Sequence, residues 1–169
     1  LVVKARYYQS LMYDAFDEDL GEELMNQLRA QGDTTTTLYA ALCYQRANLA
    51  LEQEDWVRAK SWYQIAQRVF EQYSLPLNSV YASVLNNLGA IALAHGETGL
   101  GGQYWEDAYS LSQNADQYEK ASFWIALANL ASYYYENGNI TETLALYEKH
   151  LAWEDTVVKA IEVTHDGRC

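Results

Sequence analysis

The sequence predicts an all-α fold, a solenoid of about four antiparallel helix hairpins stacked in chain order. One pattern of side chains returns at intervals of 42 residues, with small residues at Ala59, Gly101 and Thr143 and aromatic residues at Tyr63, Trp105 and Tyr147. Between these columns, apolar residues recur at spacings of three and four, which is typical of amphipathic helices. One proline and nine glycines among 169 residues leave room for long helices. The repeating unit is therefore interpreted as a helix pair that packs on its neighbours.

The chain is expected to form a single domain over residues 1–169, because no linker-like or low-complexity segment divides it. We place the hairpins at about 3–31, 33–73, 77–114 and 116–155, followed by a capping tail at 156–169. Gly96 and Gly138 stand where a first helix should end, since glycine adopts the left-handed conformation that closes helices. Asp55 and Asn139 stand where a second helix should begin and accept amide hydrogen bonds. The β-branched run at 156–163 permits a strand or a helix, and we favour a helix because a lone strand would have no sheet to join.

Two of the units share a finer set of residues, namely Asn87-Leu88-Gly89 with Gly96, Gly101, Trp105 and Ala108, and Leu130-Ala131 with Tyr134, Gly138-Asn139, Tyr147 and Leu151. On these residues, positions 38–155 resemble tetratricopeptide repeats, and positions 3–31 resemble them only loosely. The usual unit of that family has 34 residues. The longer step of this chain is similar to that of kinesin light chains and several bacterial regulators. The resemblance implies a right-handed superhelix whose first helices line a concave groove.

The resemblance also implies that a column of side chains one position before the recurring leucine projects into that groove. In this sequence the column holds three primary amides, Gln45, Asn87 and Asn129. A carboxamide both donates and accepts, so an aligned ladder of amides could pair with the backbone of an extended peptide. Similar asparagine columns occur in O-linked N-acetylglucosamine transferases and kinesin light chains. The flanking candidates are Tyr44, Asn48, Asn86, Ser132 and Tyr135, with Glu52 and Glu136 as a negative rim. The alternative is that the amides bond neighbouring helices or water.

The composition argues against several classes of function. The net charge is −12 and the pI is about 4.5, whereas a nucleic-acid surface needs clustered Lys and Arg, so we expect no direct nucleic-acid partner. His95, His150 and His165 lack helix-spaced partners for a metal, and no glycine-rich phosphate loop follows a strand. We therefore expect no enzyme activity, catalytic residue, metal or cofactor. Two distant cysteines and a start unlike a signal peptide favour a cytoplasmic location without a membrane partner.

The sequence thus predicts a protein-interaction module that holds an extended, basic or neutral peptide in an acidic groove. Two alternatives stay open. In the first, the chain is a ligand- or peptide-sensing regulatory domain of a larger bacterial transcription or signalling protein. In the second, the chain is a self-associating scaffold, a homo-oligomer in which exposed aromatic residues of an end helix pair between copies.

Overall fold

The computed structural model describes residues 18–74, 79–112 and 120–151, and within these ranges the fold is an all-α solenoid. Its helices are α2 (Glu18–Ala30), α3 (Thr37–Glu52), α4 (Trp56–Gln72), α5 (Ser79–Ala94), α6 (Thr98–Ser112) and α7 (Lys120–Glu136), followed by a helix over residues 140–151. The predicted tail at 156–169 and the first half of the predicted hairpin at 3–31 lie outside the described residues.

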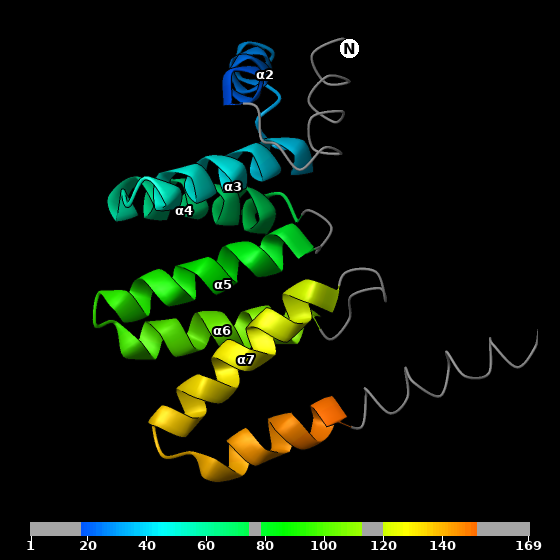
Figure 1. The fold of residues 1–169 in the computed structure, drawn as a ribbon. Coiled ribbons are helices and arrows are strands. Elements are labelled where there is room, and N and C mark those ends of the chain that lie inside the picture. The colour runs from blue at the N-terminus through cyan, green and yellow to red at the C-terminus, as the bar shows by residue number, and fades with distance from the viewer. Residues whose placement is uncertain (1–17, 75–78, 113–119, 152–169) are drawn as a thin grey trace, which may run out of the picture.

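Successive helix pairs stack in chain order along one axis (Figure 1). The helices α3 and α4 form one antiparallel pair, α5 and α6 form the next, and α7 packs on both α5 and α6. The first helices α3, α5 and α7 also contact one another in succession, whereas within the described ranges the backbones of α4 and α6 do not approach each other. The first helices therefore form the more closely spaced side of the stack, and the second helices form the more open side.

Short turns connect the two helices of each pair. Gly96 and Gly138 adopt φ angles of +77° and +78°, which confirms the predicted left-handed closures. The amide of Glu97 donates to the carbonyl of Ala92 at 2.9 Å, and the turn after Gly138 repeats this bond, so carbonyls at the helix end are satisfied. Between α3 and α4 the same conformation falls on Glu54, at φ 60°. The turn is thus kept even where glycine is absent.

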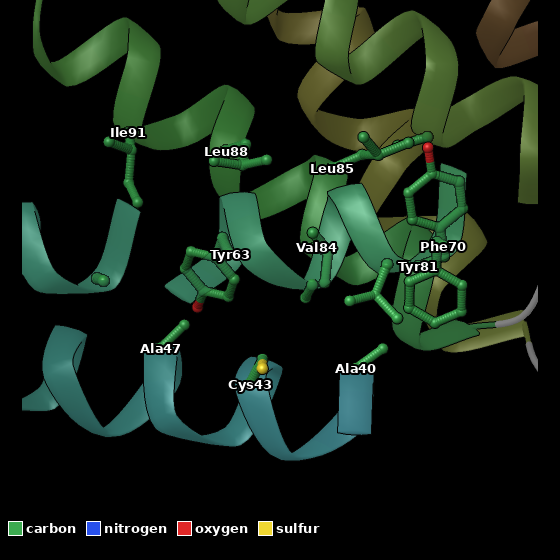
Figure 2. Packing of buried hydrophobic residues seen from close by; sticks show 14 of the residues in the cluster. Ala40, Cys43, Ala47, Tyr63, Phe70, Tyr81, Val84, Leu85, Leu88 and Ile91 are labelled. Carbon is green, nitrogen blue, oxygen red and sulfur yellow. The ribbon is translucent and has the colours of Figure 1, made fainter. Parts of the chain in front are cut away.

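The core lies between the helix layers and is built largely from small residues that face large ones. Ala40, Cys43 and Ala47 of α3 are fully buried, and they approach Tyr63 of α4 and Val84 of α5 (Figure 2). Small side chains on α3 let the neighbouring helices approach closely, so the aromatic ring fills the space between them. Burial raises the pKa of the Cys43 thiol to about 12, so this side chain acts in the core as a small apolar group.

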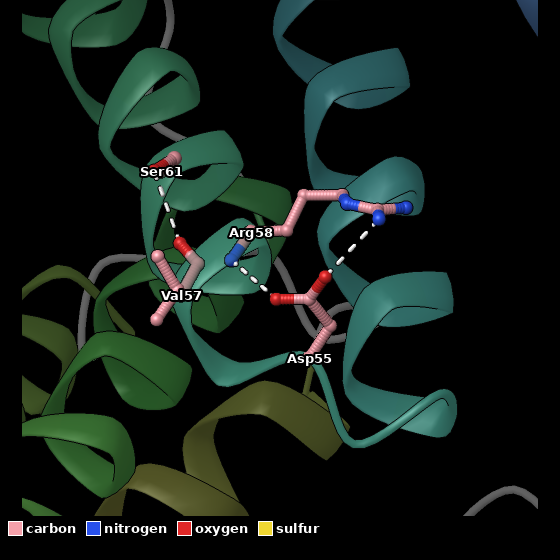
Figure 3. Close-up of polar contacts among 4 residues, drawn as sticks. All are labelled: Asp55, Val57, Arg58 and Ser61. Atoms are coloured by element: carbon pink, nitrogen blue, oxygen red, sulfur yellow. Dashed lines mark hydrogen bonds and ion pairs between the residues drawn. The ribbon is translucent and has the colours of Figure 1, made fainter.

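The start of α4 is fixed by Asp55, as predicted. One carboxylate oxygen of Asp55 accepts from the backbone amide of Arg58 at 2.9 Å, and the other lies 3.1 Å from the Arg58 guanidinium (Figure 3). One turn further, the hydroxyl of Ser61 donates to the carbonyl of Val57 at 3.0 Å. The cap satisfies an amide that has no partner inside the helix, and the ion pair is largely solvent-exposed.

We expect the capping bond, rather than the charge, to carry the stabilising effect of Asp55. Replacement of Asp55 by Ala should lower the free energy of unfolding by about 1 kcal/mol, because a helix amide loses its acceptor. Replacement by Asn keeps an oxygen acceptor and removes only the exposed ion pair, so its cost should stay below about 0.5 kcal/mol. Urea denaturation of the two variants checks this order, and equal losses would show that the ion pair dominates.

Candidate functional site

The predicted peptide-contacting residues all lie on the first helices. Gln45, Tyr44 and Asn48 lie on α3, Asn86 and Asn87 on α5, and Asn129, Ser132 and Tyr135 on α7. The structure brings most of them into two polar junctions between helices and one surface hollow. The peptide-contacting role of these residues stays a prediction.

The first junction joins α3, α4 and α5 through the hydroxyl of Tyr63. This hydroxyl donates to the Asn48 Oδ1 at 2.5 Å and accepts from the Asn87 Nδ2 at 2.8 Å. Burial, and next the nearby Tyr44, raise the pKa of Tyr63 above its ordinary value. The phenol therefore keeps its proton at neutral pH and satisfies one acceptor and one donor at the same time.

The second junction joins α5, α6 and α7, and its bonds are arranged differently. The Asn129 Nδ2 donates to the Asn86 Oδ1 at 2.9 Å, and the Trp105 Nε1 donates to the Asn86 carbonyl at 3.1 Å. Asn129 is the equivalent of Asn87 in the repeat, and Trp105 is the equivalent of Tyr63. An indole has no acceptor, so the amide of Asn129 cannot bond the ring and takes the neighbouring Asn86 instead.

The amide side chains differ in how deeply they are buried and in how many of their polar atoms are hydrogen-bonded. Asn86 is only 4% exposed, and its side chain is held inside the stack. Asn87 and Asn129 are half-buried, and each uses one amide N–H; their remaining polar atoms form no hydrogen bond with the described residues. The half-buried side chain of Gln45 forms none either within those residues. Spare donors and acceptors therefore remain at all three positions of the predicted ladder.

A hollow of about 320 Å³ lies where α7 turns into the 140–151 helix. Its lining contains two tyrosine rings, two aliphatic hydroxyl groups and one carboxylate, contributed by Ser132, Tyr135, Glu136, Thr143 and Tyr147. Ser132 and Tyr135 were predicted candidates, and Glu136 was predicted as part of the rim. The rings of Tyr135 and Tyr147 are 66% and 45% exposed. Solvent therefore reaches both aromatic walls.

Sequence reasoning missed Thr143 and Tyr147 as members of this hollow, because both belong to the repeating packing columns. The earlier members of the aromatic column are buried, with Tyr63 at 0% and Trp105 at 5% exposure. Tyr63 is covered by α5 through Asn87, and Trp105 is covered by α7, where the Tyr133 ring lies 6.1 Å from it. Within the described residues no equivalent helix covers Tyr147. A signal was present in the sequence, since Tyr147 belongs to the last of the predicted hairpins, at 116–155.

The described residues contain no group of three or more His, Cys, Asp or Glu side chains that could hold a metal ion. None of the helices in those ranges combines the length and the hydrophobicity that crossing a lipid bilayer requires.

The comparison with known proteins supports the fold. A solved structure described as the crystal structure of BtubC (BKLC) from P. vanneervenii is similar to this chain, with a TM-score of 0.64 and 20% sequence identity over 89% of the chain. The chain spans 57% of the length of that protein. No protein-family model matches the sequence, and no curated protein matches it. At this level of identity the likeness shows a shared helical-repeat fold and nothing about function.

Proposed function

We propose that this chain is a non-enzymatic protein-interaction module of the tetratricopeptide-repeat type. In this proposal an extended peptide lies against the exposed side of the first helices and is held mainly by its backbone. The amides of Gln45, Asn87 and Asn129 contact the peptide, while Asn48 and Asn86 hold the helices that carry those amides in register.

The observation that supports this proposal most is a match in register between α5 and α7. Ala90 and Ser132 are exposed at one shared column, and Ala94 and Glu136 are exposed at another. The ladder amides Asn87 and Asn129 lie one turn before Ala90 and Ser132 on the same helices, and both keep unpaired polar atoms. Small exposed side chains beside an unpaired amide leave room for a backbone to approach and form hydrogen bonds.

The charge of the chain indicates which peptides fit. The net charge is −12, and Glu52 and Glu136 are exposed at equivalent positions of α3 and α7. A basic or neutral peptide would therefore meet no like-charge repulsion, whereas an acidic peptide would. We propose a peptide partner of neutral or positive charge.

Binding should depend on the amide ladder and on the peptide backbone. Peptides selected from a random display library against the full chain serve as probes, and their affinity is measured by fluorescence anisotropy. The double variant Gln45→Ala with Asn129→Ala should weaken binding about tenfold, because two hydrogen bonds are lost. N-methylation of alternate peptide amides should weaken it at least as much, whereas alanine substitutions along the peptide should matter less.

The matched control is Asn26→Ala, which removes an exposed amide from α2, away from the first-helix columns. It should leave the affinity unchanged. Because Asn129 also bonds Asn86, thermal melting of the double variant must show that the fold persists at the temperature of the titration. Unchanged affinity of a folded double variant, or indifference to N-methylation, would remove the proposal.

A further inference from the structure

The hollow beside the 140–151 helix carries a carboxylate that has no partner in the described part of the chain. Glu136 lines the hollow and forms no ion pair or hydrogen bond with the described residues. The two basic residues of the 140–151 helix lie against aromatic rings, since the Lys149 ammonium lies 5.5 Å from the centroid of the Tyr109 ring and the His150 ring lies 4.0 Å from that of Trp124. The negative charge of the hollow is therefore uncompensated within those residues.

Elsewhere in the chain, a guanidinium group contacts a carboxylate and an aromatic ring at the same time. Near α2, the Arg46 guanidinium lies 2.6 Å from the Glu22 carboxylate and 6.0 Å from the centroid of the Trp62 ring. A planar guanidinium satisfies both partners at once, because its edge donates to the carboxylate while its face lies over the ring. The hollow offers this same pair of partners, with Glu136 as the carboxylate and Tyr135 and Tyr147 as the rings.

We infer that this hollow binds the guanidinium side chain of an arginine in the partner peptide. The inference rests on the proposed function, and it names the side chain that the groove reads. Ser132 and Glu136 lie on the face of α7 that continues from Asn129, one and two turns further on, so the hollow extends the predicted path of the peptide. The volume of about 320 Å³ lies at the lower end of the range of ligand pockets, which suits one side chain rather than a larger ligand. A lysine ammonium fits less well, since it is more strongly hydrated and cannot stack.

One other occupant follows from the repeat. The rings equivalent to Tyr147 are covered by the first helix of the following pair, so an α-helix could seat on the 140–151 helix in the same way. A helix in that place would shield the Tyr147 ring and would not require an arginine. The experiment below separates the two occupants.

The hollow is tested directly with a single-residue probe. N-acetyl-L-arginine methylamide is titrated into the full chain labelled with ¹³C-tyrosine, and the ring signals of Tyr135 and Tyr147 are followed by NMR, assigned from the Tyr135→Phe and Tyr147→Phe variants. The citrulline analogue has nearly the same shape and no charge. We expect the arginine probe to shift both rings and the citrulline probe to bind about tenfold more weakly.

Two matched variants localise the effect. Glu136→Gln should weaken the arginine probe about tenfold, whereas Glu142→Gln, which removes an exposed carboxylate outside the lining of the hollow, should leave it unchanged. Equal binding of the two probes, equal losses in the two variants, or rings that do not respond would overturn the inference. A Tyr147 ring that is shielded in the full chain and unresponsive would identify the helix as the occupant.

The outcome also separates this inference from the proposed function. In the selected peptides, replacement of arginine by citrulline should lower the affinity for the parent chain about tenfold. The Glu136→Gln variant should bind the arginine and citrulline peptides equally. If peptide affinity depends on the amide ladder but not on arginine, the arginine site is wrong and the proposed peptide groove is supported. If the single-residue probe binds while the ladder variants leave the affinity for the peptides unchanged, the proposed groove is wrong and the arginine site is supported.

Discussion

Replacement of Tyr63 by alanine is expected to lower the free energy of unfolding by about 3–5 kcal/mol. The Tyr63 side chain is 0% exposed, so its removal leaves a cavity between α3, α4 and α5. The cost should lie at the upper end of that range, because Asn48 and Asn87 lose their shared hydroxyl and are left with unpaired polar atoms. Urea denaturation followed by tryptophan fluorescence measures the loss.

Two further variants divide this effect into its parts. Tyr63→Phe keeps the ring and removes only the hydroxyl, so it should cost about 1–3 kcal/mol. Tyr147→Ala removes a tyrosine from the same column of the repeat where the ring is 45% exposed, and it should cost about 1 kcal/mol or less. If Tyr63→Ala and Tyr147→Ala were equally destabilising, the covering of the ring by the next helix would not be what stabilises the stack.

The features that could be predicted from the sequence are those set by local chemistry or by the repeat. Gly96 and Gly138 end helices because glycine tolerates positive φ angles, and this preference does not depend on the rest of the fold. The small column of Ala59 and Gly101 is buried because a helix that touches a neighbour closely needs small side chains. Both kinds of feature are visible in one sequence, since they repeat or act over a few residues.

The hydrogen-bond partners of the amides could not be predicted in the same way. Asn87 and Asn129 occupy one column, yet the first bonds Tyr63 and the second bonds Asn86. The difference arises from two exchanges in the repeat, since Trp105 stands where the first junction has Tyr63, and Asn86 stands where it has Tyr44. The second junction therefore lacks the phenol acceptor and offers a carboxamide oxygen instead. A column of identical side chains therefore does not imply a column of identical contacts. The hollow was missed for a related reason, because it depends on whether a helix covers Tyr147.

The second large effect is expected at Gly89, where a methyl group should destabilise the stack. A Cβ at this position would lie 2.5 Å from the Trp105 Nε1 and 2.7 Å from its Cδ1, and the indole is held in place by its bond to the Asn86 carbonyl. Overpacking of this kind costs about 1–3 kcal/mol, and the higher helix propensity of alanine offsets at most about 1 kcal/mol of that cost. Gly89→Ala should therefore lower the free energy of unfolding, by about 1–2 kcal/mol after this offset.

The control is Gly99→Ala in α6, because a Cβ added at Gly99 meets nothing within 4 Å. This variant should stabilise the chain by about 0.5–1 kcal/mol.

The repeat itself supplies the compensating change. At the first junction the equivalent positions hold Ala47 and Tyr63, a pair that packs with both side chains fully buried. The double variant Gly89→Ala with Trp105→Tyr reproduces that pair at the second junction, and it also restores a hydroxyl that could accept from Asn129. We expect a favourable coupling of about 1–2 kcal/mol in a double-mutant cycle, so that the double variant is more stable than the two separate losses would predict. Strict additivity would mean that Gly89 is needed for a reason other than the size of the ring that faces it.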